Sequence, residues 1–158
     1  MARLYNFLLA KVQLLADLPP LVFRLLLAYG FYGPAVQKAS NIDNVISWFT
    51  SMGMPFPELN AYMAAGTECL GVVLLAIGLA TRIISVPLMV VMIVAIKTVH
   101  WVHGFPACES VKNAEGIIET VKHGYEIPLY YFFMLFSLVV MGPGRISLDY
   151  LIKKKVVG

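Results

Sequence analysis

Three charged residues lie inside long apolar stretches of this 158-residue chain: Arg24, Glu68 and Lys97. A charge in apolar surroundings is costly, so such residues usually pair with one another or mark a functional site. A carboxylate can accept or deliver a proton, and a cation can stabilise an anionic form of a ligand. His100, three residues after Lys97, could assist proton exchange. These four residues are therefore the first candidates for chemistry.

Glu68 and Lys97 are predicted to meet because they lie equally far from a tight turn at Arg82. Glu68 precedes Arg82 by 14 residues, and Lys97 follows it by 15. A helix rises about 1.5 Å per residue, so both side chains would lie roughly 21–22 Å from the turn of a helical hairpin. We therefore predict a Glu68–Lys97 ion pair with His100 nearby, in a polar site that could hold a proton-accepting head group such as a quinone.

The same residues also permit a structural interpretation. Lys97 would then extend to one membrane surface and Arg24 to the other, with only their charged ends in water. Glu68 would serve only as a hydrogen bond between two helices. The residue types leave both interpretations open.

A second group of residues suggests metal chemistry. His100 and His103 are three residues apart, and Cys108 follows five residues later. Imidazole and thiolate groups bind copper and zinc, and the thioethers of Met52 and Met54 could add ligands for copper(I). The spacing matches no specific zinc pattern. Copper handling is therefore an alternative to the quinone site.

The composition indicates that the elements positioning these residues lie in lipid. Hydrophobic residues make up 59% of the chain and charged residues 13%, whereas about a quarter of the residues in a typical soluble domain are charged. This balance excludes intrinsic disorder, nucleic-acid binding through a basic surface and most soluble enzymes. The length predicts a single domain over residues 1–158.

Four stretches are long enough, or nearly so, to cross a bilayer core of roughly 30 Å. They comprise residues 20–38, 59–80, 83–103 and 125–141. Three shorter segments, residues 3–16, 41–52 and 111–122, carry apolar residues at helical spacing and are predicted to lie at the membrane surface. The predicted fold is an all-α, integral-membrane, four-helix antiparallel bundle with short interfacial amphipathic helices and a basic tail at 145–158.

The basic residues outside the spans predict the direction of the chain, because cytoplasmic loops carry an excess of lysine and arginine. One side would hold Arg3, Lys11, Arg82, Arg145, Lys153, Lys154 and Lys155, and the other Lys38, Lys112 and Lys122. The first side is therefore predicted to be cytoplasmic, with both termini inside. Most acidic residues fall on the outer side, which is net negative.

The order of several short motifs resembles that of the DoxX family of membrane proteins. The resemblance runs from about residue 21 to residue 151. It is carried by Arg24, Ala28-Tyr29-Gly30-Phe31-Tyr32-Gly33, Lys38, Met52-Gly53-Met54-Pro55, Glu68-Cys69-Leu70-Gly71, Gly78-Leu79-Ala80-Thr81-Arg82, Gly124-Tyr125-Glu126 and Met141-Gly142-Pro143-Gly144-Arg145-Ile146-Ser147-Leu148-Asp149. The stretch from His100 to Lys122 is less typical.

The resemblance implies a four-helix protein of the bacterial inner membrane. The family takes its name from a subunit linked to thiosulfate:quinone oxidoreductase, and other members are associated with membrane redox complexes or stress responses. The resemblance also implies functional weight for Arg24, Lys38, Glu68 and Asp149.

Three hypotheses follow. The first is a redox subunit, or redox-complex partner, that handles a quinone or small oxidisable molecule, with Glu68, Lys97 and His100 as catalytic candidates and Arg24, Lys38 and Trp101 as substrate-binding candidates. The second is copper handling through His100, His103 and Cys108. The third is a non-enzymatic scaffold. The expected partners are the lipid bilayer, a redox-complex or periplasmic protein and a second copy in a homodimer, but no nucleic acid.

Overall fold

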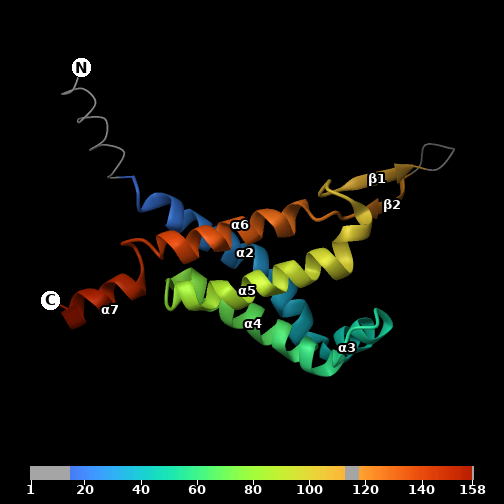
Figure 1. Cartoon of the computed structure of the whole chain (residues 1–158), viewed down its shortest axis with the longest axis horizontal. Helices are drawn as coiled ribbons and strands as arrows, with labels where there is room; N and C mark the ends of the chain where they lie inside the picture. The colour runs from blue at the N-terminus through green and yellow to red at the C-terminus, as the bar shows by residue number, and fades with distance from the viewer. Residues whose placement is uncertain (1–14, 113–117, 158) are drawn as a thin grey trace, which may run out of the picture.

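The computed structural model describes residues 15–112 and 118–157 (Figure 1). Its helices are α2 (Leu18–Ser40), α3 (Ile42–Ser51), α4 (Pro57–Ile77), α5 (Thr81–Ala95), α6 (Glu126–Met141) and α7 (Leu148–Val157). A π-helical turn, η1 (Ile96–His100), and a 3₁₀ turn, η2 (Trp101–His103), extend α5. Two strands, β1 (Glu109–Lys112) and β2 (Ile118–Lys122), form a hairpin. The predicted surface helix at residues 3–16 falls almost entirely outside the described residues.

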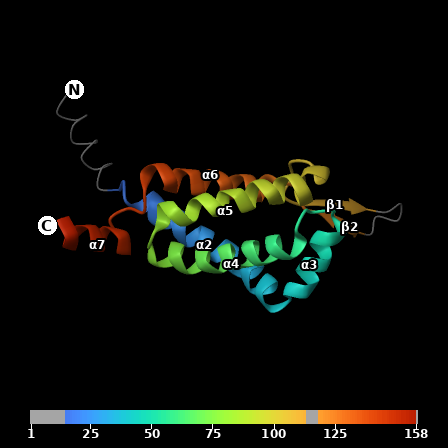
Figure 2. The ribbon, with the colours of Figure 1, turned by 60° about the horizontal axis from the view of Figure 1, so that its bottom comes forward.

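Four long helical segments pack against one another: α2, α4, α5 with its extension, and α6 (Figure 2). They begin and end within three residues of the four predicted apolar stretches. The most extensive contacts join α2 to α4 and α5 to α6, and contacts of α4 with α5 and of α2 with α6 complete the arrangement. The α4–α5 turn and α7 lie at one end, which we call the α7 end, and α3 and the β-hairpin lie at the other, the α3 end.

The outer surface of these helices indicates a membrane protein. The segments Pro57–Ile77 and Thr81–His103 are long and apolar enough to cross a bilayer, and α6 is a shorter apolar helix. Only 28% and 22% of the most apolar windows of the two longer segments are buried inside the protein. Most of their apolar side chains therefore face outward, as expected for helices surrounded by lipid.

The apolar core lies where the four long segments meet. Its side chains include Leu27, Phe31, Leu75, Leu88, Leu135 and Leu138, each at most 1% exposed. Close approach of the helices depends on Gly71, because a Cβ atom at that position would lie 2.8 Å from Leu88 Cδ1. Small residues at such contacts are typical of membrane helix packing.

The predicted helix at residues 41–52 is confirmed as α3, but the one at residues 111–122 is wrong. The strands β1 and β2 pair antiparallel there, with Glu109 opposite Lys122 and Val111 opposite Thr120. The segment from Ile118 to Lys122 reads Ile-Glu-Thr-Val-Lys, in which three of five residues are β-branched. Branching at Cβ restricts the side chain in a helix and favours the extended chain. Here this strand preference outweighs the helical spacing of the apolar residues on which the prediction was based.

At the α7 end, a buried arginine joins the first long helix to the last turn of the chain. Arg24 is 1% exposed and its Nη2 donates a hydrogen bond to the carbonyl oxygen of Ile146. Gly78, at the end of α4, makes room for the guanidinium group, because a Cβ atom there would lie 1.6 Å from Arg24 Nη1. Gly78 also has φ +70°, a conformation that glycine adopts readily.

Asp149 completes this junction. Its carboxylate accepts hydrogen bonds from the backbone N–H groups of Ala80 (2.8 Å) and Thr81 (3.0 Å), at the start of α5. Its own N–H donates to the carbonyl oxygen of Gly78 at 3.0 Å. A carboxylate at a helix N-terminus satisfies free N–H groups and complements the helix dipole. The motifs at residues 78–82 and 141–149, which are far apart in the sequence, are thus folded onto each other.

This packing predicts a marked sensitivity at Gly78. We expect Gly78→Ala to destabilise the protein by about 2 kcal/mol or more, because the new methyl group overlaps Arg24 and the backbone conformation disfavours alanine. The measurement is the melting temperature of the purified protein in detergent. Gly66→Ala, in the interior of α4 with open space around the position, is the matched control and should be neutral or slightly stabilising. Equal melting temperatures for the two variants would contradict the packing described.

Candidate functional site

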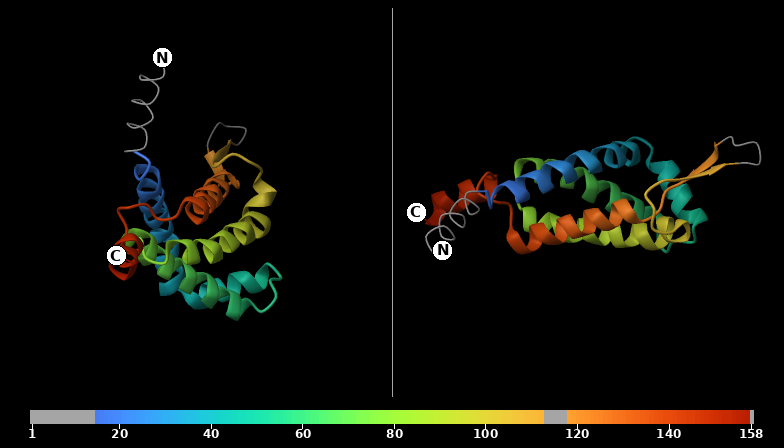
Figure 3. Two further views of the ribbon diagram at one scale, coloured as in Figure 1. Left: turned by 60° about the vertical axis from the view of Figure 1, so that its left-hand side comes forward. Right: turned by 90° about the horizontal axis from the view of Figure 1, so that it is seen from above.

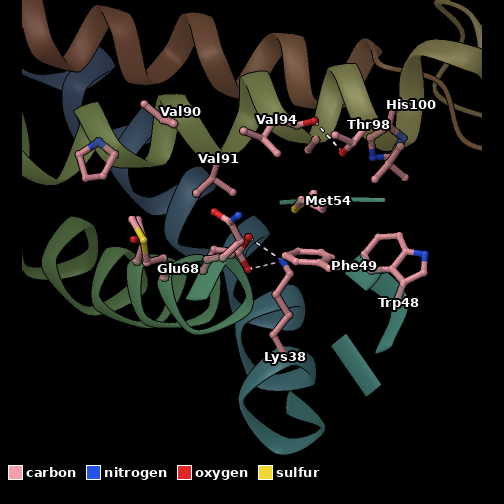
Figure 4. A pocket seen from close by; sticks show the side chains of 17 residues that line it. Lys38, Trp48, Phe49, Met54, Glu68, Val90, Val91, Val94, Thr98 and His100 are labelled. Carbon is pink, nitrogen blue, oxygen red and sulfur yellow. Dashed lines mark hydrogen bonds and ion pairs between the residues drawn. The ribbon is translucent and has the colours of Figure 1, made fainter. Parts of the chain in front are cut away.

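A buried ion pair lies in the half of the molecule nearer the α3 end. Lys38, in the last turn of α2, places its Nζ 2.6 Å from both Oε1 and Oε2 of Glu68, in the middle of α4 (Figure 4). The Glu68 side chain is 2% exposed and that of Lys38 is 20% exposed. Short, charge-assisted hydrogen bonds of this kind offset the cost of burying the carboxylate.

The two residues meet because small side chains bring α2 and α4 close together. Ala35 on α2 and Ala65 on α4 are both buried. Each precedes a member of the pair by three residues, so it lies on the same helix face as Lys38 or Glu68. The thiol of Cys69 also lies 3.8 Å from the carbonyl oxygen of Ala35. The backbone approach at these alanines therefore positions the charged groups.

The predicted Glu68–Lys97 ion pair is wrong. Lys97 is exposed and lies four residues, about one turn, after Ile93, which is also exposed. The residues of α5 and its extension that line the cavity next to Glu68 do not include Lys97. Lys97 is therefore exposed outside the cavity, and Lys38 is the partner of Glu68.

The ion pair forms part of the wall of a cavity of about 380 Å³ between α4 and the extended α5. At the α3 end, Trp48 and Phe49 of α3 and Met54 of the following turn line it (Figure 4). The other lining residues are Lys38, Asn60, Met63, Ala64, Thr67, Glu68, Pro87, Val90, Val91, Val94, Ala95, Thr98, Val99 and His100. The cavity is thus mainly apolar, with one charged pair on its wall.

Some polar groups of this wall already have partners. Thr98 donates its hydroxyl to the carbonyl oxygen of Val94 at 2.8 Å, and Asn60 donates its amide to the carbonyl oxygen of Pro55 at 2.6 Å. The imidazole Nδ1 of His100 lies 2.7 Å from the carbonyl oxygen of His123. The Lys38 ammonium has three N–H donors, of which Glu68 takes two. Among residues 15–112 and 118–157, Lys38 donates to no other group.

The structure brings three of the six quinone-site candidates to one cavity: Lys38, Glu68 and His100. Trp101 is 66% exposed and stacks on Tyr125, with ring centroids 5.6 Å apart, outside the cavity. Arg24 lies at the opposite end of α2, 14 residues from Lys38 and therefore about 21 Å away along the helix.

The candidate copper ligands are not gathered into a preformed site. Within residues 15–112 and 118–157, no group of three or more His, Cys, Asp or Glu side chains is placed to hold a metal ion. His103 and Cys108 are both exposed, and Cys108 is a free thiol. Copper handling by these residues stays a prediction.

Sequence reasoning missed most of the apolar lining. The sequence predicts Phe49 as part of a surface helix and Trp48 as part of that helix and of an aromatic belt at the membrane surface, and it gives no role to Thr67 and Thr98. The available signal was the strong amphipathicity of residues 42–51, because Val45 and Phe49 on its apolar face pack against Ala61 of α4. An amphipathic helix predicts that its apolar face packs against another part of the protein, but it does not predict a cavity there.

Comparisons with known proteins give two relatives and a family. A family model described as DoxX matches residues 20–101. A Haemophilus influenzae protein named "Uncharacterized protein" is 30% identical over 142 residues, which cover 85% of this chain and 83% of that protein. A Bacillus subtilis protein named "Putative oxidoreductase CatD" is 34% identical over 83 residues, or 52% of this chain and 60% of that protein. No solved structure matches.

The ion pair predicts unequal effects of removing two lysines. We expect Lys38→Met to lower the stability by about 2 kcal/mol, because it leaves the Glu68 carboxylate buried without its counter-charge. Lys97→Met should change the stability by less than about 0.5 kcal/mol, since its side chain is exposed. Thermal unfolding in detergent would measure both.

The double variant Lys38→Met/Glu68→Gln provides the internal control, because it removes both charges. It should be more stable than Lys38→Met alone. A loss of stability for the double variant equal to the sum of the two single losses would mean that the pair does not interact energetically.

Proposed function

The chain belongs to the DoxX family, and we propose that it is a multi-pass protein of the bacterial inner membrane that binds a quinone or similar oxidisable molecule, as a subunit or partner of a redox complex. The proposal rests mainly on the Lys38–Glu68 pair in the wall of a mainly apolar cavity. Binding sites for small molecules are typically apolar clefts of about 300–1,000 Å³ with a few well-placed polar groups.

A quinone fits the chemistry of this wall. Its carbonyl oxygen would accept the remaining N–H of Lys38, and its ring would lie against the apolar side chains, with the aromatic rings of Trp48 and Phe49 available for stacking. Reduction to the quinol consumes two electrons and two protons. In the ion pair Glu68 is a carboxylate, so it would first accept a proton from water and then pass it to the quinone oxygen held by Lys38. A second round of the same transfer would supply the second proton. His100 lies farther along the same wall. The electrons would come from the partner protein of the complex.

The relative named as an oxidoreductase supports this direction. Its match covers 52% of this chain. The printed name concerns that protein, and its extension to this chain is part of the proposal.

The proposed topology has four membrane-crossing segments in an antiparallel bundle, with both termini in the cytoplasm. The α7 end, which carries Arg82, Arg145 and the lysines at 153–155, would face the cytoplasm. Arg24 reduces the apparent hydropathy of α2, but it is buried inside the protein. Outward positions of α2 are apolar, as at Leu25, Leu26 and Val36, which are 49–52% exposed. This outward surface suits lipid.

Quinone binding is expected to depend on the ion pair. In a Trp101→Phe background, Trp48 is the remaining tryptophan, and quenching of its fluorescence by a short-chain benzoquinone would report occupancy of the cavity. We expect Lys38→Met and Glu68→Gln each to weaken binding about tenfold, which corresponds to the loss of one hydrogen bond to a charged group.

Glu58→Gln is the matched control, because Glu58 is exposed near the start of the same helix. Lys97→Met tests the sequence-based alternative directly. If Lys97→Met weakened binding and Lys38→Met did not, the assignment of the site to Lys38 would be wrong. Absence of saturable quenching in the unmodified protein would reject the proposed function.

The topology can be tested with the native cysteines. Cys108 is exposed near the α3 end, so a membrane-impermeant maleimide added to intact cells should label it in a Cys69→Ala variant. A Cys69→Ala/Cys108→Ser/Lys153→Cys variant should be labelled only after the membrane is permeabilised. The opposite pattern would reverse the proposed orientation.

A further inference from the structure

The cavity has an open side between two helices. The α4 and α5 segments are joined by a short turn at the α7 end and separate toward the α3 end (Figure 3). Three lining residues on the two sides of this separation are strongly exposed: Met63 (58%), Val90 (54%) and Val94 (40%). Glu68, between them in the wall, is 1% exposed. The cavity therefore leads from a buried charged pair to an exposed apolar rim.

This rim lies at the depth of lipid chains. Val90 and Val94 follow the first residue of α5 by 9 and 13 residues, which places them about 13 and 20 Å from the α4–α5 turn. Met63 lies six residues, about 9 Å, from the start of α4. A bilayer core of roughly 30 Å would enclose all three positions. In the proposed topology, the opening therefore faces hydrocarbon rather than water.

At the α3 end, the cavity is lined by residues of α3. Phe49 is buried and Trp48 is 44% exposed. The helix α3 is held in place because Val45 and Phe49 pack with Ala61 of α4 in a small apolar cluster. His100, on the opposite helix, is held by its contact with the carbonyl oxygen of His123. A ligand arriving from water would have to displace these contacts, whereas one arriving from the bilayer would not.

Building on the proposed function, we propose that the ligand enters sideways from the bilayer between α4 and α5, and that it is an amphiphile with a long apolar chain. Its polar head meets the Lys38–Glu68 pair. Its chain leaves the cavity past Met63, Val90 and Val94 into the surrounding lipid. The substrate class is therefore a lipid-soluble quinone with an extended tail, rather than a small water-soluble oxidisable compound.

The test compares two probes on the full-length protein in lipid nanodiscs. One probe is a dimethoxy-methyl-benzoquinone that carries a decyl chain, and the other is the same ring without the chain. Binding is measured by quenching of Trp48 fluorescence in the Trp101→Phe background. The test variant is Val90→Phe/Val94→Phe, which narrows the groove. The matched control is Val86→Phe/Ile93→Phe, on exposed positions of the same helix outside the cavity lining.

We expect the groove variant to bind the decyl quinone about tenfold more weakly than the control variant does, because each methylene group displaced from apolar contact changes affinity by about fourfold. Binding of the ring without a chain should differ between the two variants by less than about threefold. Each probe partitions into the lipid to the same extent with both variants, so partitioning does not affect the ratio of their dissociation constants.

Equal weakening of both probes, or no change with either, would overturn the sideways route while leaving the quinone site in place. Failure of both probes to bind the unmodified protein would instead reject the proposed function, and the inference with it. A melting temperature of the groove variant close to that of the control variant establishes that the comparison is made between folded proteins.

Discussion

A carboxylate buried in the middle of a membrane helix needs a compensating charge, and the arrangement at the α3 end of this protein follows from that requirement. Glu68 is almost fully buried, and Lys38 reaches it from the last turn of α2. The contact requires α2 and α4 to approach closely, which small side chains such as Ala35 and Ala65 allow. With α4 held against α2, the diverging α5 leaves space on the other side of Glu68, and that space is the cavity.

The helices could be predicted from the sequence because their signals are local. A run of about 20 apolar residues predicts a long helix wherever it occurs, and prolines and glycines mark its limits. The partner of Glu68 could not be predicted in this way. Counting residues from a turn estimates how far along a helix a side chain lies, but not its direction around the helix axis. The side chain of Lys97 is exposed and does not line the cavity beside Glu68. Lys38, 30 residues before Glu68, was indicated only by family resemblance.

Two surface segments with the same apolar spacing had different outcomes, and the difference is physical. Residues 42–51 fold as the helix α3, which contributes Trp48 and Phe49 to the cavity wall, whereas β-branched residues favour a strand at 118–122. The junction of Arg24, Gly78 and Asp149 lay beyond local reasoning for another reason. Its members come from the two ends and the middle of the chain, and their interactions exist only after the helices have packed.

The Arg24 junction has a consequence for the order of assembly. Arg24 and Ile146, whose carbonyl oxygen it binds, are 122 residues apart. During synthesis, α2 leaves the ribosome and reaches the membrane long before residue 146 has been made. Arg24 therefore has no access to this hydrogen-bond acceptor while the chain is incomplete. The junction can form only after residue 146 has been synthesised. Formation of the α7 end is thus a late step of folding. The Arg24 guanidinium, although synthesised early, reaches its final buried position only near the end of translation.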